Sequence, residues 1–214
     1  LQNYGASDRL LFAPFEYFDL SMRNDFAPLQ DLLNAVEDEF GVKYSKDWKR
    51  LLKAPQNLEG EYSIREGAKV IEKKAFSECN SLKSVIIPNS VTIIEEWAFL
   101  GCYSLRSIDI PDSVTKMGVS AFRHCNSLTS INIPDSMTTI GNHAFYNCKS
   151  LTSINISNGV MSIGDNAFEG CVSLKSIKIP DSVTSIGDYA FGECDSLSPQ
   201  VKSDIIQRFG ENVF

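Results

Sequence analysis

The chain has 214 residues, a net charge of −7 at pH 7 and a pI near 4.9. This acidity disfavours binding to nucleic acid, which needs clustered Lys and Arg, and to anionic membrane surfaces. Hydrophobic residues make up 43% of the chain and suffice for a sizeable core, but they form no apolar run of about 18 residues that predicts membrane insertion. We therefore expect a soluble monomer that binds no nucleic acid.

The N-terminal part of the chain, residues 1–57, is less regular than the rest and predicts a capping region. An amphipathic helix is expected to begin near Asp25 to Pro28 and to end at Gly41. Its apolar stripe consists of Leu29, Leu32, Leu33, Val36 and Phe40.

The segment YSKDWKRLLKAP follows this helix and predicts a hairpin with strands at 42–44 and 48–52. Upstream of the helix the chain is densely aromatic, at Phe12, Phe15, Tyr17 and Phe18. Two interpretations of these four rings remain open. They pack over the first coil of the following repeats, or they dock to an upstream segment or a partner.

The next part of the chain is a repeat with a fixed period. Six cysteines each follow the previous one by 23 residues, at Cys79, Cys102, Cys125, Cys148, Cys171 and Cys194. An Ala-Phe pair begins four residues before each cysteine, and a leucine follows three residues after it. A period of this size is typical of a solenoid, whose coils stack because none can bury its apolar face alone.

Each repeat predicts the same local elements. Apolar residues alternate after the leucine, as at Ile131 and Ile133, which indicates one strand per coil. A Pro-Asp-Ser or Pro-Asn-Ser turn usually ends this strand, and Ser157-Asn158-Gly159 replaces it once. A second apolar pair then predicts a short strand or bend before the next Ala-Phe turn.

These motifs resemble a known family. The strings SVTSIGDYAFGECDSL and SMTTIGNHAFYNCKSLTSINIP closely resemble the 23-residue, BspA-like class of leucine-rich repeat, and the match covers about residues 61–197. The resemblance implies a curved, right-handed leucine-rich-repeat solenoid. It also implies a place on secreted or surface proteins, often bacterial, that adhere to host matrix, other bacteria or host receptors.

The chain is therefore predicted to be an α/β repeat protein, a β-rich leucine-rich-repeat solenoid with short turns and capped ends. Its expected parts are a helix and hairpin cap at 1–57, six repeats at 58–197 and a helical cap at 198–214. In the last part Ser198 is a suitable N-cap, Pro199 suits the first helical position and Gly210 suits the end.

The cysteines permit three readings. Neighbouring coils about 4.8 Å apart bring Cα atoms within disulfide range, so three disulfides are possible. Zinc is disfavoured because structural sites bring close ligand pairs, whereas every spacing here is 23. A small buried hydrophobe in the same slot of every coil explains the ladder better. We expect six buried thiols and no cofactor.

The polar ladders have similar alternatives. Serines on either side of each leucine are expected to satisfy backbone groups at the turn into the strand. The turn residues Asn89, Asp112, Asp135, Asn158 and Asp181 are either solvated or hold calcium between coils, and solvation is the simpler reading. A catalytic serine is disfavoured because the two histidines occupy different slots of the repeat. We expect no enzyme.

Function should lie where the repeats differ. The outward strand positions are Ile86, Asp109, Asn132, Asn155 and Lys178, a polar face without the aromatic anchors of binding hot spots. The slots around the Ala-Phe turn are richer, and they predict one lateral patch across three coils. This lateral patch consists of Trp97, Leu100, Tyr103, Arg123, His143 and Tyr146. The alternative is that Trp97 merely covers a coil edge or meets the N-terminal cap.

Two functions remain in contention, and the resemblance to the repeat family favours the first. The first is a non-enzymatic, secreted or cell-surface module that recognises a protein or glycan of a host or bacterial surface, with weak contacts summed over many copies. The second is a structural spacer or intracellular scaffold without a ligand of its own.

Overall fold

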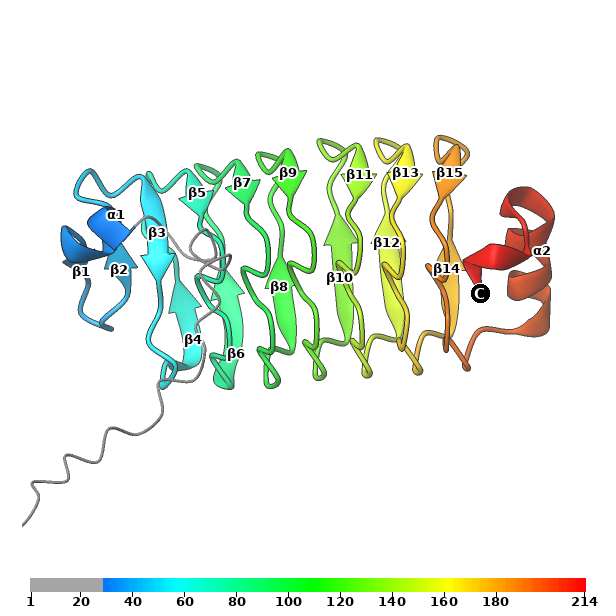
Figure 1. Ribbon diagram of the computed structural model, residues 1–214, viewed down its shortest axis with the longest axis horizontal. Coiled ribbons are helices and arrows are strands. Elements are labelled where there is room, and N and C mark those ends of the chain that lie inside the picture. Colours follow the sequence, from blue (N-terminus) through cyan, green and yellow to red (C-terminus); the bar gives the residue numbers. More distant parts are fainter. Residues whose placement is uncertain (1–28) are drawn as a thin grey trace, which may run out of the picture.

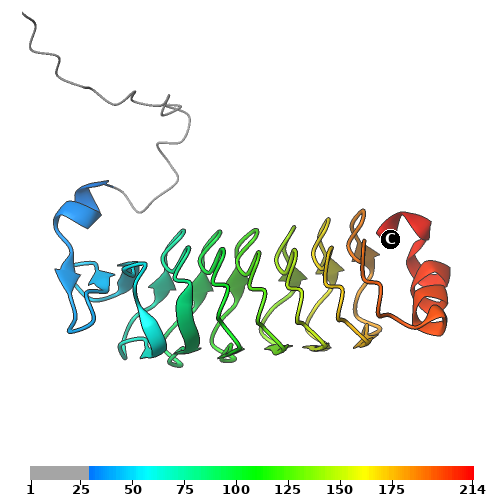
Figure 2. The ribbon, with the colours of Figure 1, turned by 90° about the horizontal axis from the view of Figure 1, so that it is seen from below.

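A computed structural model describes residues 29–214 of the chain. The predicted start of the first helix and the four upstream aromatic residues, Phe12, Phe15, Tyr17 and Phe18, lie outside this range. Residues 29–214 wind into a row of stacked coils with a hairpin at one end and a helix at the other (Figure 1). The coils follow one another along the long axis of the molecule (Figure 2). The predicted solenoid is confirmed.

Each coil contributes one longer strand to the same face. These strands form two three-stranded parallel sheets, β4-β6-β8 and β10-β12-β14. Ser130 pairs with Ser153, and Ser153 with Ser176, so equivalent residues of successive coils stand side by side. The strands are β4 (Glu59–Ser63), β6 (Ser81–Ile86), β8 (Ser107–Asp109), β10 (Ser130–Ile133), β12 (Ser153–Ile156) and β14 (Ser176–Lys178).

After the turn, each coil adds a two-residue strand on another side, as the second apolar pair predicted. Two further sheets result, with orders β1-β2-β3-β5-β7-β9 and β11-β13-β15. The first sheet begins with three strands of the N-terminal cap, β1 (Val36–Glu37), β2 (Lys43–Tyr44) and β3 (Arg50–Lys53). The short strands of the repeats are β5 (Val70–Ile71), β7 (Ile93–Ile94), β9 (Lys116–Met117), β11 (Thr139–Ile140), β13 (Ser162–Ile163) and β15 (Ser185–Ile186).

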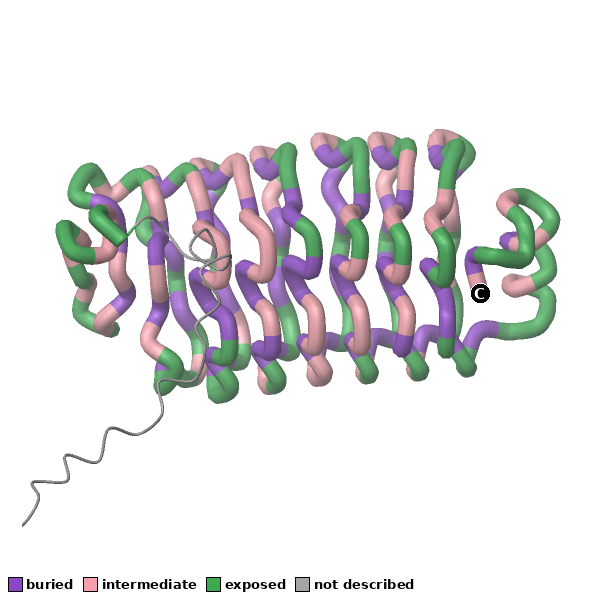
Figure 3. Tube along the Cα trace, in the orientation of Figure 1, coloured by how far each residue is buried: buried purple, intermediate pink, exposed green. Residues whose placement is uncertain are grey.

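The core lies inside the coils, and buried residues recur at equivalent places along the row (Figure 3). The Ala-Phe phenylalanines stack in one file from Phe76 to Phe191, with ring centroids 5.0 to 5.6 Å apart. All six cysteines are buried and free, which confirms the thiol reading. Their sulfurs also bond between coils, since Cys125 Sγ donates to the Phe99 carbonyl oxygen at 3.2 Å.

The predicted C-terminal end of the N-terminal helix is wrong. Helix α1 (Leu29–Leu33) ends at Leu33 instead of Gly41, and the chain then forms β1 (Val36–Glu37), which pairs antiparallel with β2 (Lys43–Tyr44). The Asp38 carboxylate accepts hydrogen bonds from the backbone N–H groups of Phe40 and Val42, both at 2.9 Å. Because these bonds close a turn, the chain turns back as a hairpin instead of continuing as a helix.

The predicted hairpin is confirmed, because β2 pairs antiparallel with β3 (Arg50–Lys53). A chain of side-chain hydrogen bonds ties this hairpin to the first coil. The hydroxyls of Tyr44 and Tyr62 share a hydrogen bond of 2.6 Å, and Tyr62 donates to Asp38 Oδ2 at 2.6 Å. The Tyr62 ring also lies 5.9 Å from Phe76, so the aromatic file continues into the cap.

At the other end, helix α2 (Pro199–Phe209) begins and ends as predicted. Ser198 accepts a hydrogen bond from the Val201 N–H, and Gly210 follows the last turn with φ of 96°. The short 3-10 helix η2 (Glu211–Val213) then brings the chain back to the last coil.

This return restores the repeat, which was not predicted. Val213 and Phe214 stand 23 residues after Ala190 and Phe191. The Phe191 N–H donates to the Val213 carbonyl at 2.8 Å, and the Phe214 ring lies 5.9 Å from that of Phe191. The cap therefore adds a seventh Ala-Phe-like step to the ladder.

Candidate functional site

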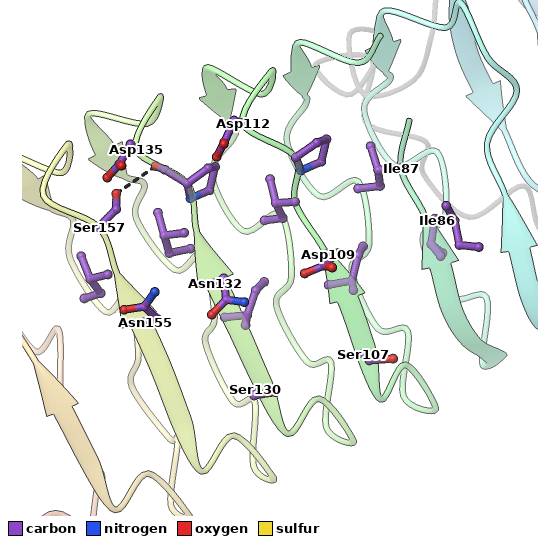
Figure 4. A pocket seen from close by; sticks show the side chains of 18 of the residues that line it. Ile86, Ile87, Ser107, Asp109, Asp112, Ser130, Asn132, Asp135, Asn155 and Ser157 are labelled. Carbon is purple, nitrogen blue, oxygen red and sulfur yellow. Dashed lines mark hydrogen bonds between the residues drawn. The ribbon is translucent and has the colours of Figure 1, made fainter. Parts of the chain in front are cut away.

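A groove of about 1150 Å³ crosses the long-strand face (Figure 4). It extends from Glu61 on β4 to Lys178 on β14 and takes residues from every intervening coil. The groove is open to solvent along its length. Its position is set by the strands and the turns that follow them.

The floor of the groove follows from strand alternation. Inward residues such as Ile108 and Ile131 pack into the core, so the residues beside them point outward. The parallel register sets these outward residues in rows across the coils. One row contains Ser107 and Ser130, and the next contains Asp109, Asn132 and Asn155. Figure 4 shows both rows on the strands, with Asp112 and Asp135 at the turns above them.

The rim of the groove is held by turn serines. Ser113, Ser136 and Ser182 each donate to a backbone carbonyl of the preceding coil, at 2.6 to 2.7 Å. In the one different turn, Ser157 donates to the Pro134 carbonyl oxygen at 2.9 Å (Figure 4). A Cβ on the following Gly159 would lie 2.0 Å from the Asp135 carbonyl oxygen, so only glycine fits there.

The expectation for the strand serines is corrected by these contacts. In the described part of the chain, the hydroxyls of Ser107 and Ser130 bond no backbone group, and both residues are exposed in the groove. Coil-to-coil backbone contacts are instead made by turn serines and by Thr129 and Thr152, whose hydroxyls donate to the preceding coil. The repeated serine therefore leaves a polar surface available.

The groove carries more negative than positive charge. Its acidic residues are Glu61, Asp109, Asp112 and Asp135, and its basic residue is Lys178. Within residues 29–214 no basic side chain forms an ion pair with any of these four carboxylates. Glu61 accepts a hydrogen bond from Ser84 at 3.0 Å.

Ring contacts join some of the six residues of the predicted lateral patch. The Trp97 side chain is half-buried, and the ammonium groups of Lys73 and Lys74 lie 4.6 and 5.0 Å from its ring centroid. Tyr103 is exposed beside Gly101. Leu100 is half-buried, and its carbonyl accepts from the Glu78 N–H at 2.8 Å.

The other patch residues form a cluster around Tyr146. The Arg123 guanidinium lies 4.5 Å from the Tyr146 ring centroid, and the His143 ring lies 5.7 Å away. His124, which was not predicted, meets the same ring edge-on at 5.7 Å. Burial lowers the pKa of His124, and the nearby charges of Arg123 and Lys149 lower it further. Among the described residues, no ring contact joins Trp97 to this cluster.

The residue before each Ala-Phe pair has a positive φ, which its residue type does not indicate. The six residues in this slot all adopt φ between 54° and 58°, the left-handed region, although none is glycine. They are Lys74, Trp97, Ser120, His143, Asn166 and Tyr189. The slot thus shares a backbone conformation and leaves its side chain free to differ.

The described residues offer little reactive chemistry. Burial raises the pKa of the thiols, to about 12 at Cys148 and Cys194, so they remain protonated near neutral pH. Among residues 29–214, no group of three or more His, Cys, Asp or Glu side chains is arranged to hold a metal ion. Within the same range, no helix has the length and apolarity needed to cross a membrane.

Comparisons with known proteins agree with this architecture. The family model of the BspA type leucine-rich repeat region matches residues 69–198 in six copies. No curated protein matches the chain.

Three solved leucine-rich repeat proteins resemble the structure. The protein from Eubacterium ventriosum is 25% identical with a TM-score of 0.69, and the match covers 75% of this chain and 50% of that one. The T. pallidum protein is 24% identical with a TM-score of 0.68, over 86% and 93% of the two chains. The Bacteroides ovatus protein is 30% identical with a TM-score of 0.54, over 75% and 48%. The chain thus spans half the length of the first of these proteins.

Proposed function

We propose, because the chain belongs to the BspA-type leucine-rich repeat family, that it is a non-enzymatic binding module of a secreted or cell-surface protein. Its ligand is a protein or glycan of a host or bacterial surface, and it lies in the groove of the long-strand face. Family membership supports the proposed class of function, and the groove supports the long-strand face as the binding surface.

The groove carries this proposal because the outward side chains of its strands have no evident role in the fold. The Ala, Phe, Cys and Leu positions of the core are the same in all six coils, whereas one outward row changes from Asp109 to Asn132, Asn155 and Lys178. Such a row spans several rigid coils and offers hydrogen-bond donors and acceptors. It fits an elongated polar ligand that contacts each coil weakly, with avidity supplied by many copies.

The absence of an enzymatic role is supported by the surroundings of the reactive side chains. The six thiols are buried and bonded to backbone carbonyls or packed in the core. His124 and His143 contact the Tyr146 ring rather than a nucleophile. General acid-base or nucleophilic catalysis needs such groups within hydrogen-bond reach of one another and of a substrate.

A binding panel with two variants tests the proposal. Wild type, the groove variant Asn132→Leu/Asn155→Leu and the lateral variant Trp97→Ser/Tyr146→Ser are compared on immobilised matrix proteins and glycans. Thermal unfolding first checks that each variant is folded. We expect wild-type binding that the groove variant loses and the lateral variant retains.

The other outcomes separate the alternatives. Loss only in the lateral variant would contradict the groove and move the site to the aromatic side chains predicted from the sequence. No binding by any of the three proteins would favour the structural spacer or intracellular scaffold.

A further inference from the structure

We infer that the groove binds an extended, basic polypeptide segment that places an aliphatic side chain on Ile86. This inference rests on the proposed function and names the ligand class of the same groove. It follows from the charge of the groove, from the pairing state of its carboxylates, from one exposed apolar side chain and from the length of the sheet.

The carboxylates of the groove are available to a ligand. Asp109, Asp112 and Asp135 are exposed, and no ion pair engages them within residues 29–214. Two acidic residues next to the short strand β7 differ from them, because Glu95 pairs with Lys116 at 3.1 Å and Glu96 with Lys73 at 3.2 Å. The groove therefore has a local excess of negative charge, four carboxylates against the one ammonium group of Lys178, and this excess attracts a cationic partner.

One apolar side chain stands among these charges. Ile86 is 50% exposed, and the sheet register places it directly beside Asp109. Its equivalents in the next coils are polar, so Ile86 is not required there by the repeat. An aliphatic side chain of a ligand would cover Ile86 while neighbouring basic side chains reach the carboxylates.

The size of the sheet fits a short extended chain. Five steps between neighbouring strands separate β4 from β14, which is about 24 Å at about 4.8 Å per step. An extended polypeptide of about seven residues spans this distance. Lys178 lies at the far end of the groove and would meet an acidic side chain, which gives the bound segment a direction.

A polypeptide is favoured over a glycan by the lining. None of the residues that line the groove is aromatic, so the groove offers no ring on which a sugar can stack. A peptide backbone needs only the hydrogen-bonding groups that Ser107, Ser130 and Asn132 supply.

Fluorescence anisotropy with defined peptides tests the inference. The probe is a labelled peptide of about eight residues that contains two lysines and a central leucine, and the matched peptide carries glutamate in place of lysine. We expect the folded chain to bind the lysine peptide, and binding to weaken as salt is raised from about 20 to 150 mM. We expect the glutamate peptide not to bind.

Matched variants locate the contacts. The variant Asp109→Asn/Asp112→Asn/Asp135→Asn should bind the lysine peptide about tenfold more weakly, because several exposed charge pairs are lost. The control Glu39→Gln/Glu193→Gln/Asp195→Asn makes the same charge change outside the groove and should bind like wild type. Ile86→Ser should weaken binding of the leucine peptide more than that of an alanine version.

Several results would overturn the inference. These are absence of lysine-peptide binding, equal binding of the glutamate peptide, and equal weakening by the two triple variants. The binding panel with matrix proteins and glycans then separates two claims, that the groove is the binding site and that its ligand is a basic polypeptide. A glycan whose binding the Asn132→Leu/Asn155→Leu variant loses would keep the groove as a binding site while rejecting a polypeptide ligand. No ligand in either experiment would reject both.

Discussion

The buried cysteine shows how one residue serves both packing and hydrogen bonding in this fold. The thiol fills a small slot beside the phenylalanine file, and its hydrogen reaches a carbonyl of the preceding coil, as from Cys148 to Phe122 at 3.2 Å. The Phe122 carbonyl oxygen also accepts a hydrogen bond from the Cys125 N–H at 3.1 Å, so the thiol adds a second hydrogen bond to it and links the two coils. The spacing of 23 residues was enough to predict the burial, but not the hydrogen bond.

The buried thiols are expected to make the protein less stable as the pH rises into the alkaline range. Burial raises the pKa of Cys79 to about 11 and of Cys148 to about 12, whereas an unfolded thiol ionises near pH 8.5. The folded pKa is the higher one, so this contribution is complete below about pH 8.5 and is lost as pH rises through the folded pKa. Above about pH 8.5 each thiol should lower the free energy of unfolding by up to about 1.4 kcal/mol per pH unit.

Urea unfolding at pH 8, 9 and 10 measures this effect. The double variant Cys125→Ala/Cys148→Ala should be less stable than wild type at pH 8, because it leaves two small cavities. Its stability should also fall less steeply with pH. Tyrosines and lysines are the same in both proteins, so parallel pH slopes would contradict the role assigned to the thiols.

The positive φ of the residue before each Ala-Phe pair could not be predicted from the sequence. A tryptophan or histidine gives no sign that its φ is positive, because bulky residues rarely adopt this conformation. Trp97 and His143 do so because the coil requires a tight turn before Ala-Phe. The sequence showed that the slot varies, and the lateral patch that it indicated stays a prediction. In the structure Trp97 lies among lysines, while His143 meets Tyr146.

At the scale of elements, the repeats were predictable and the caps only partly so. The alternation of apolar residues and the proline turns recur in every coil, so each coil supports the interpretation of the others. The N-terminal cap occurs once, and Leu29 and Leu33 at helical spacing suggested a longer helix than α1. The hydrogen bonds from the Phe40 and Val42 N–H groups to the Asp38 carboxylate form a turn there instead of a longer helix. The boundaries at residues 57 and 197 stay predictions.

The C-terminal cap is attached to the last coil through Arg208. Its guanidinium donates to the carbonyl oxygens of Ile179, Pro180 and Val183, at 2.8 to 3.2 Å. Helix α2 contributes the buried Ile205 to the same junction. These contacts close the end of the solenoid, which otherwise exposes core and unpaired strand.

We expect Arg208→Ala to loosen this end alone. Losing charge-assisted hydrogen bonds from a partly exposed side chain should cost about 1 to 2 kcal/mol. Each coil of a solenoid contacts only its neighbours, so the loss of stability should stay near the C-terminal end. Hydrogen exchange should therefore become faster at 176–214 and stay unchanged at 59–110. The exposed Arg106→Ala is the control. Uniformly faster exchange along the chain would contradict a local role for the cap.

At the scale of the whole molecule, stacking converts a repeated sequence into two kinds of surface. The side with short strands includes ion pairs between coils, such as Glu95 with Lys116. The long-strand face has a groove with unpaired carboxylates and exposed serines. The sequence predicted the outward rows of that face, but its polarity argued for a weak site. The depth of the groove depends on where the turns stand relative to the strands, which no single repeat reveals.

The most direct test of the account is a hydrogen-exchange footprint on the wild-type chain, with and without the panel member that it binds most tightly. We predict slower exchange at 84–87, 107–112 and 130–135, which line the groove, and no change at 97–103 or 143–146. Protection confined to 97–103 and 143–146 would contradict the groove as the binding surface and assign that role to the lateral aromatic side chains.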